Sequence, residues 1–310
     1  MFYRYVTATV TCSNFDRSEA RGDIIGVSLT NDSCQEPRNI ISVKQRSPNW
    51  KPTHQFSMCP GVMFGNYSDL DDFVQYVEVN NIFGGDFVTL YNYSISPTLE
   101  PYIDYYKLKK RLEVVQWNLP VKSNENALSD ENNDVHYFAQ TAAMSDCLYR
   151  AYLSSKFVVY LDLDELIVPI NGSKKWLDFM PEHRKFGAYQ IRSTFFPREC
   201  KRFENHLTNP LLQRLPLKAF QYFFRQEYIF PYRVRSKWIG RPENVEIAEI
   251  HFPGALRNAK EYLVPETHAL VYHYRYWKGC KDKTIINEQI LGLKEDTLTR
   301  LYNLTHAIVT

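Results

Sequence analysis

An apolar run that ends in three carboxylates is the strongest constraint in this sequence. Residues 157–161 are rich in β-branched and aromatic side chains, and Asp162, Asp164 and Glu165 follow them. The run predicts a strand buried on both faces, and clustered anions at its end would be costly to bury alone. A divalent cation with oxygen ligands would relieve that cost. Because successive side chains alternate along a strand, Asp162 and Asp164 are expected on one face, within reach of one ion.

Helices and strands alternate ahead of these acids. Apolar residues at helical spacing predict three helices, and a strand-like run follows each of them. The helices are expected around 70–77, 99–106 and 144–151, and the strands at 87–91, 113–117 and 157–161. Ser68 is the expected N-cap of the first helix, and Gly84 and Gly85 are expected to end it. This alternation is typical of βαβ units in a parallel sheet, which binds ligands at the carboxyl ends of its strands.

The chain divides into an appendage and one large domain. Residues 1–58 are polar and show no sustained period, so we expect an N-terminal appendage of short strands and loops. Residues 59–310 are expected to form one domain, with halves at 59–169 and 170–310. The second half carries strand-like runs at 188–191 and 245–250 and a helix-like tail at 282–302.

Composition excludes some partners and favours a compartment. The net charge of +2, without a basic block, argues against a nucleic-acid groove. The six cysteines include no Cys-x-x-Cys, which argues against zinc. Together with five Asn-x-Ser/Thr sequences, they favour a secretory lumen over the cytosol. Cys147 lies on an apolar helix stripe, so it is expected to be a core thiol or half of a disulfide.

Membrane attachment is expected only through an anchor absent from this chain. No stretch reaches the roughly 18 apolar residues of a membrane helix.

Two reaction types place an Asp-x-Asp pair after a strand. In aspartyl phosphoryl transfer the pair follows the first strand of the domain, and a Thr or Val is expected where this chain has Leu166. In glycosyl transfer the pair ends the nucleotide-binding half and holds a metal that bridges the diphosphate. Asp162 and Asp164 follow about the fourth strand, which favours glycosyl transfer. A phosphatase and a non-catalytic module that binds glycan or nucleotide sugar remain as alternatives.

Cationic and imidazole side chains downstream could complete such a site. A departing nucleoside diphosphate needs neutralisation, for which Lys237, Arg241 and Arg275 are candidates. His251 and His273 are candidates for a metal ligand or a diphosphate contact. For each of the five, an ordinary structural role is the alternative.

Several segments together resemble glycosyltransferase family 92. The most specific match combines DCLYR at 146–150 with FVVYLDLDELIVP at 157–169, at a fixed spacing. The resemblance extends over about residues 59–276. Its segments are 67–70, 87–92, 140–150, 157–169, 237–251 and 273–275.

The resemblance implies a GT-A-like α/β fold, with a mostly parallel sheet flanked by helices, and a metal-dependent transferase. Residues 59–169 would bind UDP-galactose, and 170–310 would bind a glycan or glycoprotein acceptor. Characterised members are inverting β-1,4-galactosyltransferases that act on fucose in N-glycan cores and face the Golgi lumen from a single-pass anchor.

The same resemblance suggests roles for individual residues. Mn²⁺ or another divalent ion would be held by Asp164, with His251 as a later ligand. Asp162 would contact the ion or the ribose. Glu165 is the candidate for the base, since it lies close to the donor site, and orienting the metal ligands is its alternative role.

Overall fold

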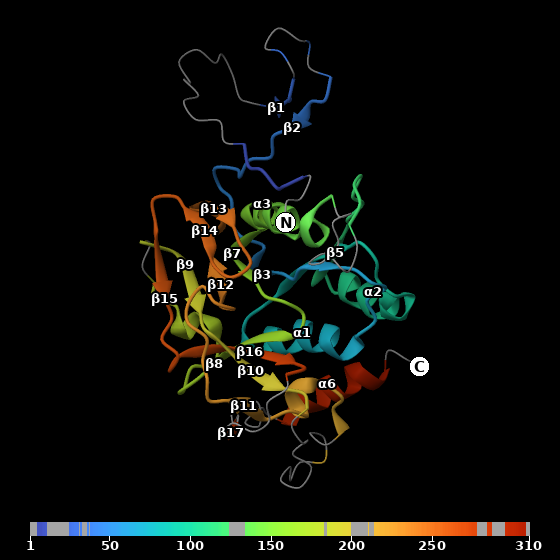
Figure 1. Cartoon of the computed structure of the whole chain (residues 1–310), viewed down its shortest axis with the longest axis vertical. Helices are drawn as coiled ribbons and strands as arrows, with labels where there is room; N and C mark the ends of the chain where they lie inside the picture. The colour runs from blue at the N-terminus through green and yellow to red at the C-terminus, as the bar shows by residue number, and fades with distance from the viewer. Residues whose placement is uncertain are drawn as a thin grey trace.

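The chain has an α/β fold built around an eight-stranded sheet (Figure 1). This computed structural model describes residues 5–10, 25–30, 32, 36, 38–123, 134–182, 185–199, 210, 214–277, 284–286 and 295–307. Within these ranges helices flank a multi-stranded sheet, which confirms the predicted fold class.

The centre of the large sheet is parallel. β3 pairs in parallel with β5 and β7, and β12 then enters antiparallel between β7 and β9. The carboxyl ends of β3, β5 and β7 therefore meet at one edge, where ligands bind in such sheets. The order is β15 (Lys260–Leu263), β9 (Phe186–Ile191), β12 (Lys237–Gly240), β7 (Ser155–Tyr160), β3 (His54–Cys59), β5 (Phe87–Asn92) and β4 (Val62–Met63), with β6 (Leu112–Gln116) beside β5.

The first strand of this sheet lies in the segment that was expected to be an appendage. β3 begins at His54, and its Phe56 and Met58 are buried between β5 and β7. The boundary at residue 59 therefore falls at the end of a central strand. β1 (Gly26–Val27) and β2 (Ile41–Ser42) form a separate hairpin at the top of Figure 1.

The predicted helices are present, with one change at a cap. α1 (Leu70–Phe83) is capped by Asp69, which accepts a hydrogen bond from the Asp72 N–H at 3.0 Å. The prediction of Ser68 as N-cap is thus wrong by one residue. The helix ends at Gly84, whose φ of 137° favours glycine. The other predicted helices are α2 (Glu100–Leu108) and α3 (Gln140–Ser154).

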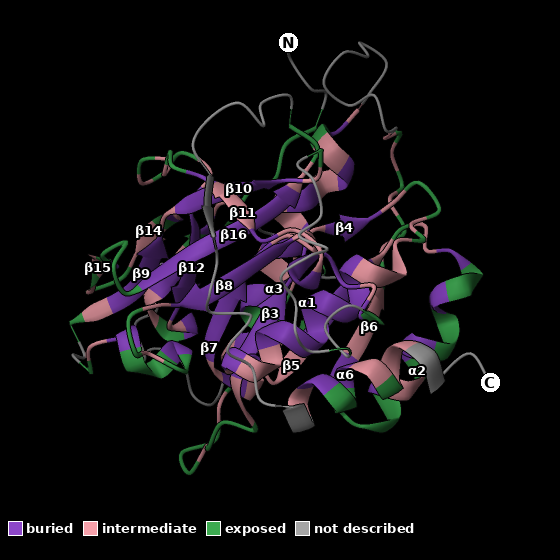
Figure 2. Cartoon of the chain, turned by 90° about the horizontal axis from the view of Figure 1, so that it is seen from below, coloured by how far each residue is buried: buried purple, intermediate pink, exposed green. Residues whose placement is uncertain are grey.

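A second, three-stranded sheet packs beside the large one. In it β16 (Ala269–Arg275) lies between β10 (Ser193–Pro197) and β8 (Glu165–Pro169), and α1 packs against β8. Figure 2 shows the strands of both sheets as mostly buried, whereas α2 and α6 (Glu295–Ala307) each expose one side. The chain crosses from the large sheet to the small one between β7 and β8, and the acidic residues occupy this crossing.

The second half of the chain departs further from expectation. The strand expected at 188–191 is β9, and the one at 245–250 is the shorter β13 (Val245–Ala248), paired with β14 (Pro253–Leu256). The helix expected at 282–302 is wrong in its first part. Residues Thr284–Ile286 form β17, which pairs with β11 (Phe224–Gln226), and α6 begins at Glu295.

A disulfide joins the first central strand to the third helix. Cys59 at the end of β3 bonds Cys147 of α3, with Cα atoms 6.2 Å apart, and both residues are buried. The disulfide is one of the two roles expected for Cys147. The other cysteines, Cys12, Cys34, Cys200 and Cys280, lie outside the described residues. None of the described helices has the length and apolar character needed to cross a membrane.

Candidate active site at the turn between β7 and β8

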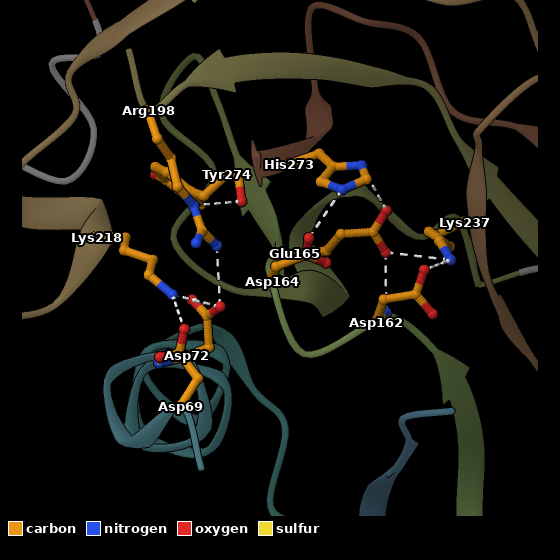
Figure 3. Close-up of polar contacts among 10 residues, drawn as sticks. All are labelled: Asp69, Asp72, Asp162, Asp164, Glu165, Arg198, Lys218, Lys237, His273 and Tyr274. Atoms are coloured by element: carbon orange, nitrogen blue, oxygen red, sulfur yellow. Dashed lines mark hydrogen bonds and ion pairs between the residues drawn. The ribbon is translucent and has the colours of Figure 1, made fainter. Parts of the chain in front are cut away.

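Asp162 and Asp164 lie in a tight turn between two strands. The Glu165 N–H donates to the Asp162 carbonyl at 3.0 Å, and Glu165 Oε2 accepts from the Asp162 N–H at 2.9 Å. The turn sends Asp162 toward Lys237 and Asp164 toward His273 (Figure 3). The expectation of an extended strand with both side chains on one face is therefore wrong. Both carboxylates nevertheless line the same cleft.

Lys237 neutralises this turn from inside the protein. Its Nζ lies 2.6 Å from Asp162 Oδ2 and 3.2 Å from Glu165 Oε2, and the residue is 1% exposed. Burial alone would lower the pKa of Lys237, but the two carboxylates raise it above its usual value. The main cleft is not lined by Lys237. Its role as a diphosphate contact stays a prediction, and the structure adds that its ammonium group pairs with two carboxylates.

Glu165 is also enclosed. It is 1% exposed, and burial raises its pKa to about 7 although Lys237 opposes the shift. Its carboxylate accepts from the Asp162 N–H and pairs with Lys237. Glu165 nevertheless lines the cleft, so its role as the base stays a prediction. Its contacts fit the alternative role, which is to orient the metal ligands.

His273 holds Asp164 from the neighbouring strand. In the β8–β16 ladder His273 lies opposite Glu165, and its Nε2 is 3.0 Å from Asp164 Oδ2. Its Nδ1 is 3.2 Å from Glu165 Oε1, outside hydrogen-bond geometry. Burial lowers the pKa of His273, but the nearby Glu165 and Asp164 raise it by more, so the pKa lies above its usual value. For Asp164 burial raises the pKa, but the bond from His273 and nearby cations lower it overall. His273 thus positions a carboxylate; because it also lines the cleft, its role as a metal ligand or diphosphate contact stays a prediction.

A cleft of about 770 Å³ opens at this turn, a volume typical of small-molecule sites. Its walls come from β4, the start of α1, the segment before α3, the β7–β8 turn and the second half of the chain. Charged and imidazole groups in the lining include Asp162, Asp164, Arg198, Arg235, His251 and Arg275.

The two aspartates fit a cation whose shell a substrate completes. Each uses Oδ2 in the contacts above, and the side chains remain 38% and 32% exposed at the cleft. Among the described residues, no three or more His, Cys, Asp or Glu side chains converge as a ready-made metal site. Ions such as Mg²⁺ are commonly held by one or two carboxylates together with substrate phosphates.

His251 lines the same cleft. Its Nδ1 is 3.2 Å from the Ser236 carbonyl oxygen. Burial and the nearby Lys237 lower its pKa, which favours the neutral form that binds metals. The structure does not bring His251 together with Asp162 and Asp164 as a three-residue site, so its role as a ligand stays a prediction.

The two predicted arginines lie in different places. Arg275 lines the cleft, as a diphosphate contact must. Arg241 lies outside the cleft lining, donates to the Phe186 carbonyl at 3.2 Å and packs over the Phe157 ring. Its contact with the diphosphate stays a prediction, whereas in the structure its guanidinium group links β9 to β7.

Sequence analysis missed several residues that reach the cleft from strand ends and turns. Arg198 follows β10 and donates to the Tyr274 carbonyl and to Asp72 Oδ2, each at 2.9 Å (Figure 3). Its position after a strand-like run was the available signal. Tyr137 lies in a turn of three consecutive residues with positive φ, of 44°, 56° and 55°, just before α3. Nothing in the sequence marks that turn, because none of the three is glycine.

Comparisons with known proteins find glycosyltransferases among the relatives of this chain. Beta-1,4-galactosyltransferase galt-1 of Caenorhabditis elegans is 22% identical over 76% of this chain and 52% of its own length. Glycosyltransferase family 92 protein F13G3.3 of the same organism is 32% identical over 67% of this chain and 40% of its own. The chain thus spans about half or less of these relatives.

Among solved structures, the crystal structure of GalNAc-T7 with UDP, GalNAc and Mn²⁺ is 12% identical. It covers 82% of this chain and 48% of its own, with a TM-score of 0.35. The model of glycosyltransferase family 92 matches residues 54–304, from the start of β3 into α6. The chain belongs to glycosyltransferase family 92.

Proposed function

We propose that this chain is the catalytic domain of a metal-dependent, inverting glycosyltransferase of the GT-A type. The observation that carries the proposal is the turn with Asp162 and Asp164, which opens on a cleft of about 770 Å³. Carboxylates on one wall and guanidinium groups on another are suited to a divalent ion and a nucleoside diphosphate.

The proposed donor is UDP-galactose and the proposed acceptor a glycan, with the fucose of N-glycan cores as first candidate. The donor is supported by the 22% identity to a relative named as a β-1,4-galactosyltransferase. The acceptor rests on the resemblance to characterised members of the family.

In this proposal the chain holds the donor still for a single displacement at the anomeric carbon. Asp164 and Asp162 would hold Mn²⁺, which when bound supplies Lewis-acid neutralisation of the diphosphate. Lys237 and His273 fix the two carboxylates through the contacts at 2.6 Å and 3.0 Å. Such preorganisation means that little reorganisation remains at the moment of reaction.

We also propose that the domain works in the lumen of the Golgi. The disulfide between Cys59 and Cys147 supports an oxidising compartment. Asn66, Asn171 and Asn303 of the glycosylation sequences are exposed, as an oligosaccharide transferase requires.

The function is tested by turnover of UDP-galactose with Mn²⁺ and a fucosylated N-glycan. Asp164→Ala is expected to reduce turnover by at least about 10³-fold, because it removes the firmest metal ligand. Asp104→Ala is the matched control, since the Asp104 side chain is 66% exposed and its ion pair is with Lys107 on the same helix, α2. Turnover that persists at the wild-type rate in the presence of EDTA would refute the metal requirement.

A second measurement separates an enzyme from a non-catalytic module. A ligand that binds only the folded state raises the melting temperature. A panel of UDP-sugars, each with and without Mn²⁺, should therefore raise it most for the true donor. Stabilisation without turnover on any acceptor would favour the module.

A further inference from the structure

Two guanidinium groups that line the cleft have no carboxylate partner among the residues that the structure describes. Arg235 and Arg275 both line the cleft, and within the described part of the chain neither forms an ion pair. Arg275 Nε is buried without a hydrogen-bond partner. By contrast, Arg198 on the same wall pairs with Asp72, and Arg233 in the same loop as Arg235 pairs with Glu261, each at 2.9 Å. The cleft thus holds two cations whose donors are available to a ligand.

The guanidinium groups of Arg235 and Arg275 both contact one buried ring, that of Phe195. The guanidinium carbon of Arg235 lies 5.4 Å from the centroid of Phe195, and that of Arg275 lies 5.2 Å from it. Phe195 is wholly buried in β10, so its position is fixed by the small sheet. Contacts of this kind orient a guanidinium plane without using its N–H donors. The donors therefore stay free for oxygen atoms.

The same ring connects the arginine pair to the acidic turn. Phe195 lies opposite His273 in the β10–β16 ladder, and the two rings meet edge to face with centroids 5.3 Å apart. His273 in turn holds Asp164 at 3.0 Å. The two arginines are thus linked to Asp164 through one ring and one imidazole, and all three residues line the same cleft.

We propose that Phe195, Arg235 and Arg275 form an oxyanion site in which the ring positions the two arginines. Two like charges against one ring repel each other, and a bound anion removes that repulsion. Bidentate guanidinium groups match the oxygens of phosphate-type ligands. The anion comes either from the diphosphate of the donor, in which case the site rests on the proposed function, or from a charged group on the acceptor.

Calorimetric titration of the whole chain with inorganic pyrophosphate, inorganic sulfate, UDP and uridine tests the site. Arg235→Gln and Arg275→Gln are each expected to weaken pyrophosphate binding about tenfold or more, because each loses a charge-assisted hydrogen bond. Arg233→Gln is the matched control. It removes the same charge from the same loop, but Arg233 pairs with Glu261 and does not line the cleft, so a change of less than about twofold is expected.

The role of Phe195 is tested by coupling. Phe195→Leu keeps an apolar side chain but removes the ring, and it is expected to weaken pyrophosphate binding about fivefold. In that background Arg235→Gln should cost less than it does in the wild type, whereas a purely structural role of Phe195 predicts additive losses.

The affinities for pyrophosphate, sulfate, UDP and uridine together show whether the oxyanion site exists and where its anion comes from. Weaker binding of both UDP and pyrophosphate, with uridine unchanged, supports the diphosphate as the source. Loss of sulfate binding alone supports an anion on the acceptor. If the wild type binds pyrophosphate through these arginines but does not bind UDP, the oxyanion site stands and the nucleotide-sugar function fails. If it binds neither pyrophosphate nor sulfate, or if both arginine variants bind like the wild type, the oxyanion site is refuted.

Discussion

At the scale of single residues, the site depends on a balance of buried charge. Asp162, Glu165 and Lys237 form a compact group in which one ammonium faces two carboxylates. Glu165 and Lys237 are each 1% exposed, so neither can turn to water if its partner is lost. The Asp162 carboxylate at the cleft is therefore held by two residues that are almost wholly buried.

Replacing Lys237 tests this balance. Lys237→Met should lower the free energy of unfolding by about 3–5 kcal/mol, because it leaves a buried carboxylate unpaired. Urea unfolding measures the change. Adding Glu165→Gln to Lys237→Met should restore part of the lost stability, because it removes the unpaired charge of the Glu165 carboxylate. Arg257→Met, which breaks an exposed pair with Glu246, should cost less than about 1 kcal/mol, and an equal loss in both single variants would contradict the argument.

At the scale of elements, local patterns predicted most of the first half and less of the second. α1, α2 and α3 and the strands after them follow from periodicity, because each buries one continuous face. β3 was missed because its start, at His54 and Gln55, is polar and lacks that pattern. The acidic pair was found, but its turn was not, since the apolar runs on both sides suggest one long strand. The arginines of the cleft come from strand ends and loops, where no period marks them.

The disulfide links two elements of the fold, and the sequence alone did not predict which two cysteines form it. Cys59 and Cys147 are 88 residues apart, and they join β3 to α3 next to the cleft. Closing so long a loop restricts the unfolded chain, so Cys59→Ala with Cys147→Ala should lower the free energy of unfolding by about 2–5 kcal/mol. Dithiothreitol should lower the melting temperature of the wild type and leave that of the double variant unchanged. A similar shift in both proteins would show that the stabilising bond lies elsewhere.

At the scale of the whole molecule, the two predicted halves share one sheet. β9, β12 and β15 come from residues 170–310, yet they extend the sheet beside β7 of the first half. In return β8 of the first half pairs with β16 of the second. Arg300 of α6 also reaches the fully buried Glu78 of α1, at 2.6 Å. The two halves could bind donor and acceptor separately, but the large sheet and the three-stranded sheet are each built from strands of both halves.

This exchange of strands predicts that neither half folds alone. A fragment of residues 54–169 lacks β12, which covers the edge of β7, and Lys237, which neutralises Asp162 and Glu165. Urea titration followed by circular dichroism should therefore show no cooperative transition for this fragment and a single one for the whole chain. A chain without residues 1–42 is the control, because the hairpin of β1 and β2 adds no strand to the large sheet, and it should keep the transition. A cooperative transition in the fragment would mean that the first half is stable by itself and that the shared sheet is an accessory to its fold.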